Sequence, residues 1–164
     1  MRIAGLVQDS IVDGPGLRFS VFTQGCTHAC PGCHNPETHD ITGGNEMAVS
    51  DIIKKMESNP LTDGVTLTGG DPFCQASDCA DIAEAAHSLG LNVWTYTGYT
   101  FEQVKRLAET DGGFARLLRA TDVMVDGPFV LEKRTLSLRW RGSTNQRLID
   151  VKKSLETGEA VLAE

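Results

Sequence analysis

The chain has 164 residues, of which 40% are hydrophobic and 23% are charged, and its formal net charge at pH 7 is −7. This length and composition are typical of one globular domain spanning residues 1–164, and we expect no second domain. The acidic balance argues against non-specific nucleic-acid binding, and the lack of an apolar run of about 18 residues argues against a membrane span.

The N-terminal segment, residues 1–9, does not resemble a signal peptide because it has one arginine and no long apolar run. We therefore expect a cytoplasmic protein that binds neither nucleic acid nor membranes. Five cysteines in a reducing compartment indicate metal or redox chemistry rather than disulfides. A local exception to the acidic balance lies near the C-terminus, where basic residues gather: Lys133, Arg134, Arg139, Arg141 and Arg147.

Strand and helix patterns alternate along the chain. Short runs of bulky residues, several of them followed by glycine, predict strands, whereas apolar residues at helical spacing, such as Ile52, Ile53 and Met56, predict helices. The expected strands cover residues 17–22, 64–68, 92–96 and 121–125, and the expected helices cover 48–56, 76–89 and 101–109. This alternation favours an α/β fold with a largely parallel sheet. Because a complete barrel needs about 250 residues, we expect a partial (β/α) barrel.

Each of four unusual segments follows a predicted strand. They are the cysteine-rich loop at residues 26–33, Gly69–Pro72, Thr97–Tyr99 and Asp126–Pro128. Ligands in parallel α/β folds bind at the carboxyl ends of the strands. We therefore expect these segments to meet at one rim of the sheet.

The first of these segments has the spacing C-x3-C-x2-C, formed by Cys26, Cys30 and Cys33. A [4Fe–4S] cluster ordinarily takes four thiolates, so three cysteines leave one iron open to another ligand. Cys74 or Cys79 is an alternative fourth ligand. We favour the interpretation that both are small, partly buried residues with no role in the cluster.

The glycines in Gly69-Gly70-Asp71-Pro72 allow the backbone to approach a ligand closely. Asp71 has two readings, because its carboxylate suits either a cationic ammonium group or the cap of a helix that starts near Phe73. Beside a three-cysteine loop, we favour a ligand site over a plain turn.

The combined motifs resemble the radical S-adenosylmethionine superfamily, and in particular the activases of glycyl radical enzymes. The cysteine loop and Gly69–Pro72 carry the wider resemblance. The activase resemblance rests on Asp13-Gly14-Pro15-Gly16-Leu17-Arg18, Gln24-Gly25-Cys26 and Cys33-His34-Asn35-Pro36. Residues 30–33, 94–99, 125–129 and 140–146 narrow it to members that act on anaerobic ribonucleoside-triphosphate reductase. Two departures are His34-Asn35-Pro36, which is more similar to the formate-lyase type, and Gly32, where the superfamily usually has an aromatic residue.

The resemblance implies a set of site residues. Cys26, Cys30 and Cys33 would bind three irons of a [4Fe–4S] cluster, and S-adenosylmethionine would chelate the fourth. Gly69, Gly70, Asp71 and Pro72 would meet the methionine amino group through backbone oxygens. The remaining cofactor contacts implied are Gly32, Cys33 and His34 near the adenine, and Thr95, Thr97 and Asp126 from adjacent strand ends.

The resemblance also implies the reaction. Reduced flavodoxin or ferredoxin would supply an electron that cleaves S-adenosylmethionine, and the resulting 5′-deoxyadenosyl radical would take a hydrogen atom from one glycine of the reductase. The cofactors carry the difficult chemistry, so no side chain of this chain is expected to act as a catalytic acid or base.

Other functions remain open at this point. They include an activase of another glycyl radical enzyme such as pyruvate formate-lyase, a radical enzyme acting on a small molecule, and a zinc or electron-transfer module. Zinc sites usually pair two C-x2-C elements or add histidines, and simple ferredoxins supply four cysteines per cluster, so the last class fits least well.

Several noticeable residues are expected to be structural. We interpret His28 and His39 as exposed loop residues, and His87 and Trp94 as parts of a helix and of the core. Trp140, beside Arg139 and Arg141, suits either partner docking or the cofactor pocket, and the sequence does not choose between them.

Overall fold

A computed structural model describes residues 1–33 and 35–163 of the chain. Within these residues the strands form one seven-stranded sheet with the order β3-β1-β2-β4-β5-β6-β7. The strands are β1 (Arg2–Ser10), β2 (Arg18–Thr23), β3 (Asn45–Glu46), β4 (Gly64–Gly69), β5 (Asn92–Tyr96), β6 (Val123–Asp126) and β7 (Arg147–Asp150).

The sheet is mixed, so the prediction of a largely parallel sheet is wrong. The central strands β2, β4, β5 and β6 are parallel to their neighbours in this group. The outer strands β1, β3 and β7 pair antiparallel with theirs. The connections explain the difference, because only the central strands are joined by crossover helices, which parallel neighbours require.

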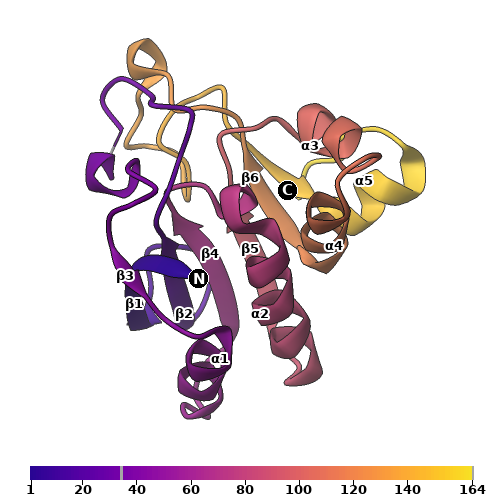
Figure 1. Ribbon diagram of the computed structural model, residues 1–164. Helices are drawn as coiled ribbons and strands as arrows, with labels where there is room; N and C mark the ends of the chain where they lie inside the picture. Colours follow the sequence, from indigo (N-terminus) through magenta and orange to yellow (C-terminus); the bar gives the residue numbers. More distant parts are fainter. Residues whose placement is uncertain (34, 164) are drawn as a thin grey trace.

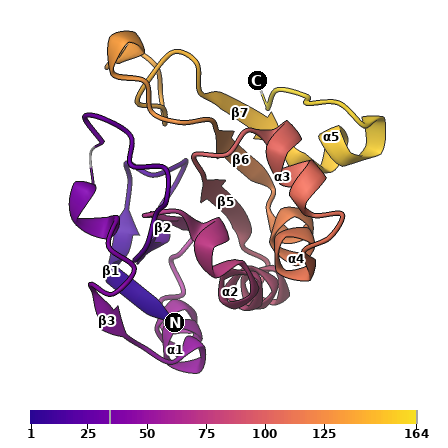
Figure 2. The same ribbon diagram turned by 45° about the horizontal axis from the view of Figure 1, so that its top comes forward.

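Helices cover one face of the sheet. Figures 1 and 2 show α1 (Val49–Glu57), α2 (Ala76–Ser88) and α4 (Gly112–Ala120) packed along the strands, with α3 (Phe101–Leu107) and α5 (Val151–Thr157) nearer the β7 edge. No helix in the described ranges is long and apolar enough to cross a membrane.

The main core lies between these helices and the sheet. Alternate strand residues, such as Phe19 and Val21 in β2 and Val65 and Leu67 in β4, are fully buried against it. The period of two in strands places their neighbours in sequence on the opposite face. That face therefore presents a different set of side chains from the one that contacts the helices.

Loops cover the opposite face of the sheet, and the pocket described below lies on this face. Trp94, Val125 and Leu148 form a second, smaller core cluster there, against which Trp140 packs with its ring centroid 5.9 Å from that of Trp94. The loop between β1 and β2 covers part of the same face.

Arg18 attaches that loop to the sheet. Its buried guanidinium donates to the Pro15 carbonyl oxygen, the Thr66 hydroxyl and the Asn92 side-chain oxygen at 2.7–2.9 Å. Burial lowers the pKa of Arg18 to about 10. Because the guanidinium is fully buried and already hydrogen-bonded to the loop and to two strands, it is not available to a ligand.

Candidate metal and cofactor site

A cavity of about 340 Å³ lies at the carboxyl ends of the central strands, as the sequence predicted for a ligand site. Residues from the cysteine loop, from the ends of β4, β5 and β6 and from the loops on either side form its walls. The residues that line it are Val12, Asp13, Cys26, His28, Cys30, Cys33, Asn35, Thr68, Gly69, Gly70, Tyr96, Thr97, Gly98, Val125, Gly127, Phe129, Trp140, Arg141, Gly142 and Gln146.

The cysteine loop starts where β2 ends and is closed by hydrogen bonds at its base. The Gly25 and Cys26 amides donate to the carbonyl oxygens of Thr38 and His39 at 2.6 and 3.2 Å. The buried Gln24 side chain donates to two further carbonyl oxygens of the same loop. These bonds close the base of the loop beside the strand ends.

All three cysteines of the loop are unlinked, half-buried and part of the pocket wall. Burial raises the pKa of the Cys26 thiol, and the backbone amides of His28 and Ala29 act in the opposite direction by hydrogen-bonding its sulfur. The Asn35 amide donates to Cys33 Sγ at 3.4 Å. Amide donors of this kind stabilise thiolates and tune the reduction potential of a cluster that such thiolates bind.

The donor set fits a [4Fe–4S] cluster. Within the described residues, no three Cys, His, Asp or Glu side chains converge on a point as ligands of one metal ion do. A cluster does not need such convergence, because each thiolate binds a different iron. Three thiols on one wall of an open pocket therefore suit a cluster with one iron left for an external ligand.

The remaining cysteines do not join this wall. Cys79 is fully buried in the main core on α2, where burial raises its thiol pKa. Cys74 is an exposed residue of the short helix η2 (Pro72–Gln75), and its sulfur faces Thr27. Both cysteines were expected to be partly buried, whereas Cys79 is fully buried and Cys74 is exposed.

The Gly69-Gly70 turn is pressed against the end of β2 and the cysteine loop. Gly69 has a φ of +96°, a conformation that favours glycine, and a Cβ atom on Gly70 would collide with the Gly25 carbonyl oxygen. The amides of Gly70 and Asp71 donate to the Thr23 and Gly25 carbonyl oxygens at 2.8 Å. Among the described residues nothing donates to the Gly70 carbonyl oxygen, which leaves an acceptor for a cationic ligand.

The Asp71 carboxylate is fully occupied by the protein. It accepts from the Phe73 amide at 3.0 Å, from the Thr97 hydroxyl at 2.9 Å and from the Gly98 amide at 3.0 Å. The capping interpretation of Asp71 is therefore confirmed, because the Phe73 bond caps η2. The carboxylate does not line the pocket, so its contribution is to hold the strand ends in place.

His28 also binds Asp71, which makes the expectation of an exposed loop histidine wrong. Its Nε2 lies 2.7 Å from Asp71 Oδ2, its side chain is only 18% exposed, and its ring packs edge-on against Tyr99 at 4.6 Å. His39 is half-buried rather than exposed.

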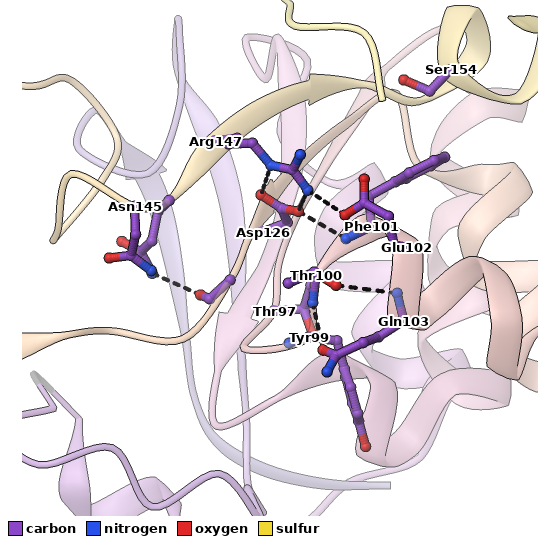
Figure 3. A network of polar contacts seen from close by, with 12 residues as sticks. Thr97, Tyr99, Thr100, Phe101, Glu102, Gln103, Asp126, Asn145, Arg147 and Ser154 are labelled. Atoms are coloured by element: carbon purple, nitrogen blue, oxygen red, sulfur yellow. Dashed lines mark hydrogen bonds and ion pairs between the residues drawn. The ribbon is translucent and has the colours of Figure 1, made fainter. Parts of the chain in front are cut away.

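Thr97 lines the pocket, but two neighbouring predictions lie on the other face of the sheet. The buried Thr95 hydroxyl pairs with Thr121 at 2.8 Å. Figure 3 shows Asp126 between Arg147, which donates from Nε at 3.0 Å, and the Phe101 amide at the start of α3. Side chains alternate along strands, and this alternation directs both residues away from the pocket.

The other predicted contacts divide as follows. Gly32 is exposed, has a φ of +74° and lies against Leu131 and Phe129 from a distant part of the chain. Pro72 is buried behind the turn, and neither residue is among those that line the pocket. The prediction for His34 falls outside the described residues.

Sequence reasoning named no ligand role for several residues of the pocket wall. Tyr96 is the clearest case, since a period of two from the core residue Trp94 places it on the pocket face. Phe129 and Gln146 belong to motifs noted in the sequence, but only the fold brings them to the cysteines. Trp140, for which the sequence left partner docking and the cofactor pocket open, lines the pocket.

Comparisons with known proteins agree on one group. Residues 12–149 match the family described as "4Fe-4S single cluster domain". Proteins named anaerobic ribonucleoside-triphosphate reductase-activating protein are similar over most of their length. The Salmonella typhi protein is 34% identical over 83% of this chain and 90% of its own. The corresponding figures are 33%, 83% and 90% for the Escherichia coli K12 protein and 34%, 84% and 86% for the phage T4 protein.

Proposed function

We propose, because this chain belongs to the family of anaerobic ribonucleoside-triphosphate reductase-activating proteins, that it activates an anaerobic reductase of that kind. The activation is the formation of a glycyl radical on the reductase. The observation that carries the proposal is the joint position of three half-buried thiols and the Gly69-Gly70 turn on the wall of one pocket.

Cys26, Cys30 and Cys33 would hold a [4Fe–4S] cluster. When bound, such a cluster supplies one electron to S-adenosylmethionine, whose reductive cleavage leads to removal of a hydrogen atom from a glycine of the reductase. The amides near Cys26 and Cys33 stabilise the thiolates for this role. The pocket wall would orient the reacting groups.

S-adenosylmethionine would bind between the cysteines and the strand ends. The Gly70 carbonyl oxygen suits its ammonium group, since no described residue donates to that oxygen. Gly69 and Thr97 would border the same ligand. Asp71 and Pro72 would contribute to cofactor binding indirectly, by stabilising the turn. Asp126 and Thr95 would contribute by stabilising the strands that carry them. Contacts of Gly32, Cys33 and His34 with the adenine stay predictions.

We extend the proposal to properties that the family name does not specify. Residues 1–164 would form one domain, and its sheet would be a partial (β/α) barrel whose inner face carries the pocket. The protein would work in the cytoplasm, with reduced flavodoxin or ferredoxin as its electron donor and with no role in nucleic-acid binding.

The test combines spectroscopy with a protein substrate. After anaerobic reconstitution with iron and sulfide, the protein should bind about four irons per chain and cleave S-adenosylmethionine when reduced. Incubation with the reductase should then give the doublet electron paramagnetic resonance signal of a glycyl radical. Cleavage without that signal would contradict the assignment of the reductase as substrate, and colourless protein with tightly held zinc would contradict the cluster.

A further inference from the structure

We infer that the segment 131–141, the basic loop, is the docking surface for the glycine-bearing region of the reductase, and that the partner presents apolar and acidic side chains to it. This inference rests on the proposed function and adds the surface and the chemistry of contact. Most residues of the basic loop lie outside the pocket wall.

The basic loop is an ordered projection at the mouth of the pocket. The Thr135 amide donates to the Gly142 carbonyl oxygen at 3.0 Å and the Thr144 amide to the Lys133 carbonyl oxygen at 2.9 Å, so the two arms of the projection pair. Figures 1 and 2 show it in orange beside the cysteine loop. The contact is direct, because Gly32 faces Leu131 and Phe129.

Exposed apolar side chains gather on this projection. Leu136 is 93% exposed, Leu131 45% and Leu138 37%. Across the pocket, Val12 of the β1–β2 loop is 72% exposed and lines the cavity. Large apolar side chains grouped around an active-site opening are typical of a surface that another protein covers.

The same loop is positively charged on an acidic protein. Between residues 131 and 141 there are four basic side chains and one acidic side chain, whereas the whole chain has a net charge of −7. Lys133, Arg134 and Arg139 are exposed. None of them takes part in an ion pair with another described residue. Their charges are therefore available to an acidic partner.

The position of the loop identifies the occupant. The reaction takes place on a glycine within another protein, so a segment of that protein must enter the pocket while the surface around it lies on the pocket mouth. Trp140 and Arg141 line the pocket directly after the exposed part of the loop. A partner whose glycine reaches the cysteines would thus contact Leu136 and Arg139 as it docks. Opposite charge at such a rim accelerates association and orients the partner.

The test uses Leu136→Ser and Arg139→Glu, singly and together, in the reconstituted protein. Neither residue lines the pocket, so reductive cleavage of S-adenosylmethionine without the reductase should stay at the wild-type rate. Binding of the double variant to the reductase, measured by calorimetry, should weaken about tenfold or more, because central apolar and charged anchors dominate interfaces. The yield of glycyl radical should fall with it.

Two controls make the same kinds of substitution away from the basic loop. They are Leu61→Ser, at a residue that is 70% exposed and precedes β4, and Lys152→Glu on α5. Both should bind the reductase as the wild type does. Added salt should weaken the wild-type complex more than the Arg139→Glu complex. Wild-type affinity and radical yield in the double variant would overturn the inference. A wild-type protein that binds the reductase but gives no glycyl radical would instead contradict the proposed function.

Discussion

His28 Nε2 lies 2.7 Å from Asp71 Oδ2, and this contact joins the cysteine loop to the turn that follows β4. Asp71 in turn binds the Thr97 hydroxyl and the Gly98 amide at the end of β5. One buried carboxylate therefore fixes the relative positions of the thiols, the Gly69-Gly70 turn and the next strand end. Preorganisation of this kind matters because a cofactor held by several segments binds well only if those segments are already in register.

Asp71→Ala should destabilise the protein by about 3 kcal/mol, because it leaves the buried Phe73 amide and the partly buried Gly98 amide without acceptors. His28→Ala should cost roughly 1–2 kcal/mol, since it removes one hydrogen bond to a charged group. The double variant should cost less than the sum of the two, as expected for residues in contact. Urea unfolding of the cluster-free protein measures all three values.

The exposed Asp51→Ala on α1 is the control and should change stability by less than about 0.5 kcal/mol. Strict additivity would show that the contact contributes nothing.

Gly70→Ala should disrupt both stability and cofactor binding. The added methyl group has no space beside the Gly25 carbonyl oxygen, so either the turn or the cysteine loop has to move. We expect a loss of roughly 1–3 kcal/mol, the usual cost of forcing extra atoms into a packed site. Binding of S-adenosylmethionine to the reconstituted protein, measured by calorimetry, should weaken in parallel. Gly112→Ala at the start of α4 is the matched control, because its Cβ would meet no neighbour within 4 Å. Equal behaviour of the two variants would contradict the close approach at Gly70.

The fold was predictable where local and tertiary preferences agree. The strands expected at 64–68 and 92–96 correspond to β4 and β5, and the helix expected at 76–89 corresponds to α2, which is followed by Gly90 with a φ of +77°. The antiparallel strands β1 and β7 and the helix α4 were missed. Six of the nine residues of β1 are charged, polar, glycine or alanine, and α4 begins with two glycines, so neither has a strong local signal.

The site was predictable at the level of segments and less so at the level of side chains. The cysteines, Gly69, Gly70 and Thr97 meet at one pocket as expected from strand ends. Thr95 and Asp126 belong to the same strand ends but lie on the helix-covered face. Which face a residue takes depends on strand register, and a shift of one residue exchanges the two faces. The Arg147 partner of Asp126 could not be inferred either, because it comes from the unpredicted β7.

Asp126→Asn should separate a structural role from a ligand role at this position. The change weakens the ion pair with Arg147, which also binds Glu102, and should lower stability by roughly 2–4 kcal/mol, because one charge of a partly buried pair loses its partner. Affinity of the folded, reconstituted protein for S-adenosylmethionine should change less than about twofold, since Asp126 does not line the pocket. Thermal unfolding and calorimetry at a temperature well below the transition provide the two measurements. A large loss of affinity with little loss of stability would show that Asp126 contacts the cofactor.

Removal of the cluster should change the reactivity of three cysteines and leave a fourth unchanged. With the cluster bound, Cys26, Cys30 and Cys33 should resist iodoacetamide because their sulfurs are iron ligands, and after iron removal by a chelator all three should be alkylated. Cys79 should stay unmodified in both forms, because it is fully buried in the core.

Cys74 should react slowly at pH 8 in both forms. Desolvation of its thiol raises its pKa to about 11, so the reactive thiolate becomes abundant only as the pH approaches that value. Mass spectrometry of peptides identifies each site. Protection of Cys74 that depends on the cluster would make it a fourth ligand and would close the iron position that S-adenosylmethionine needs.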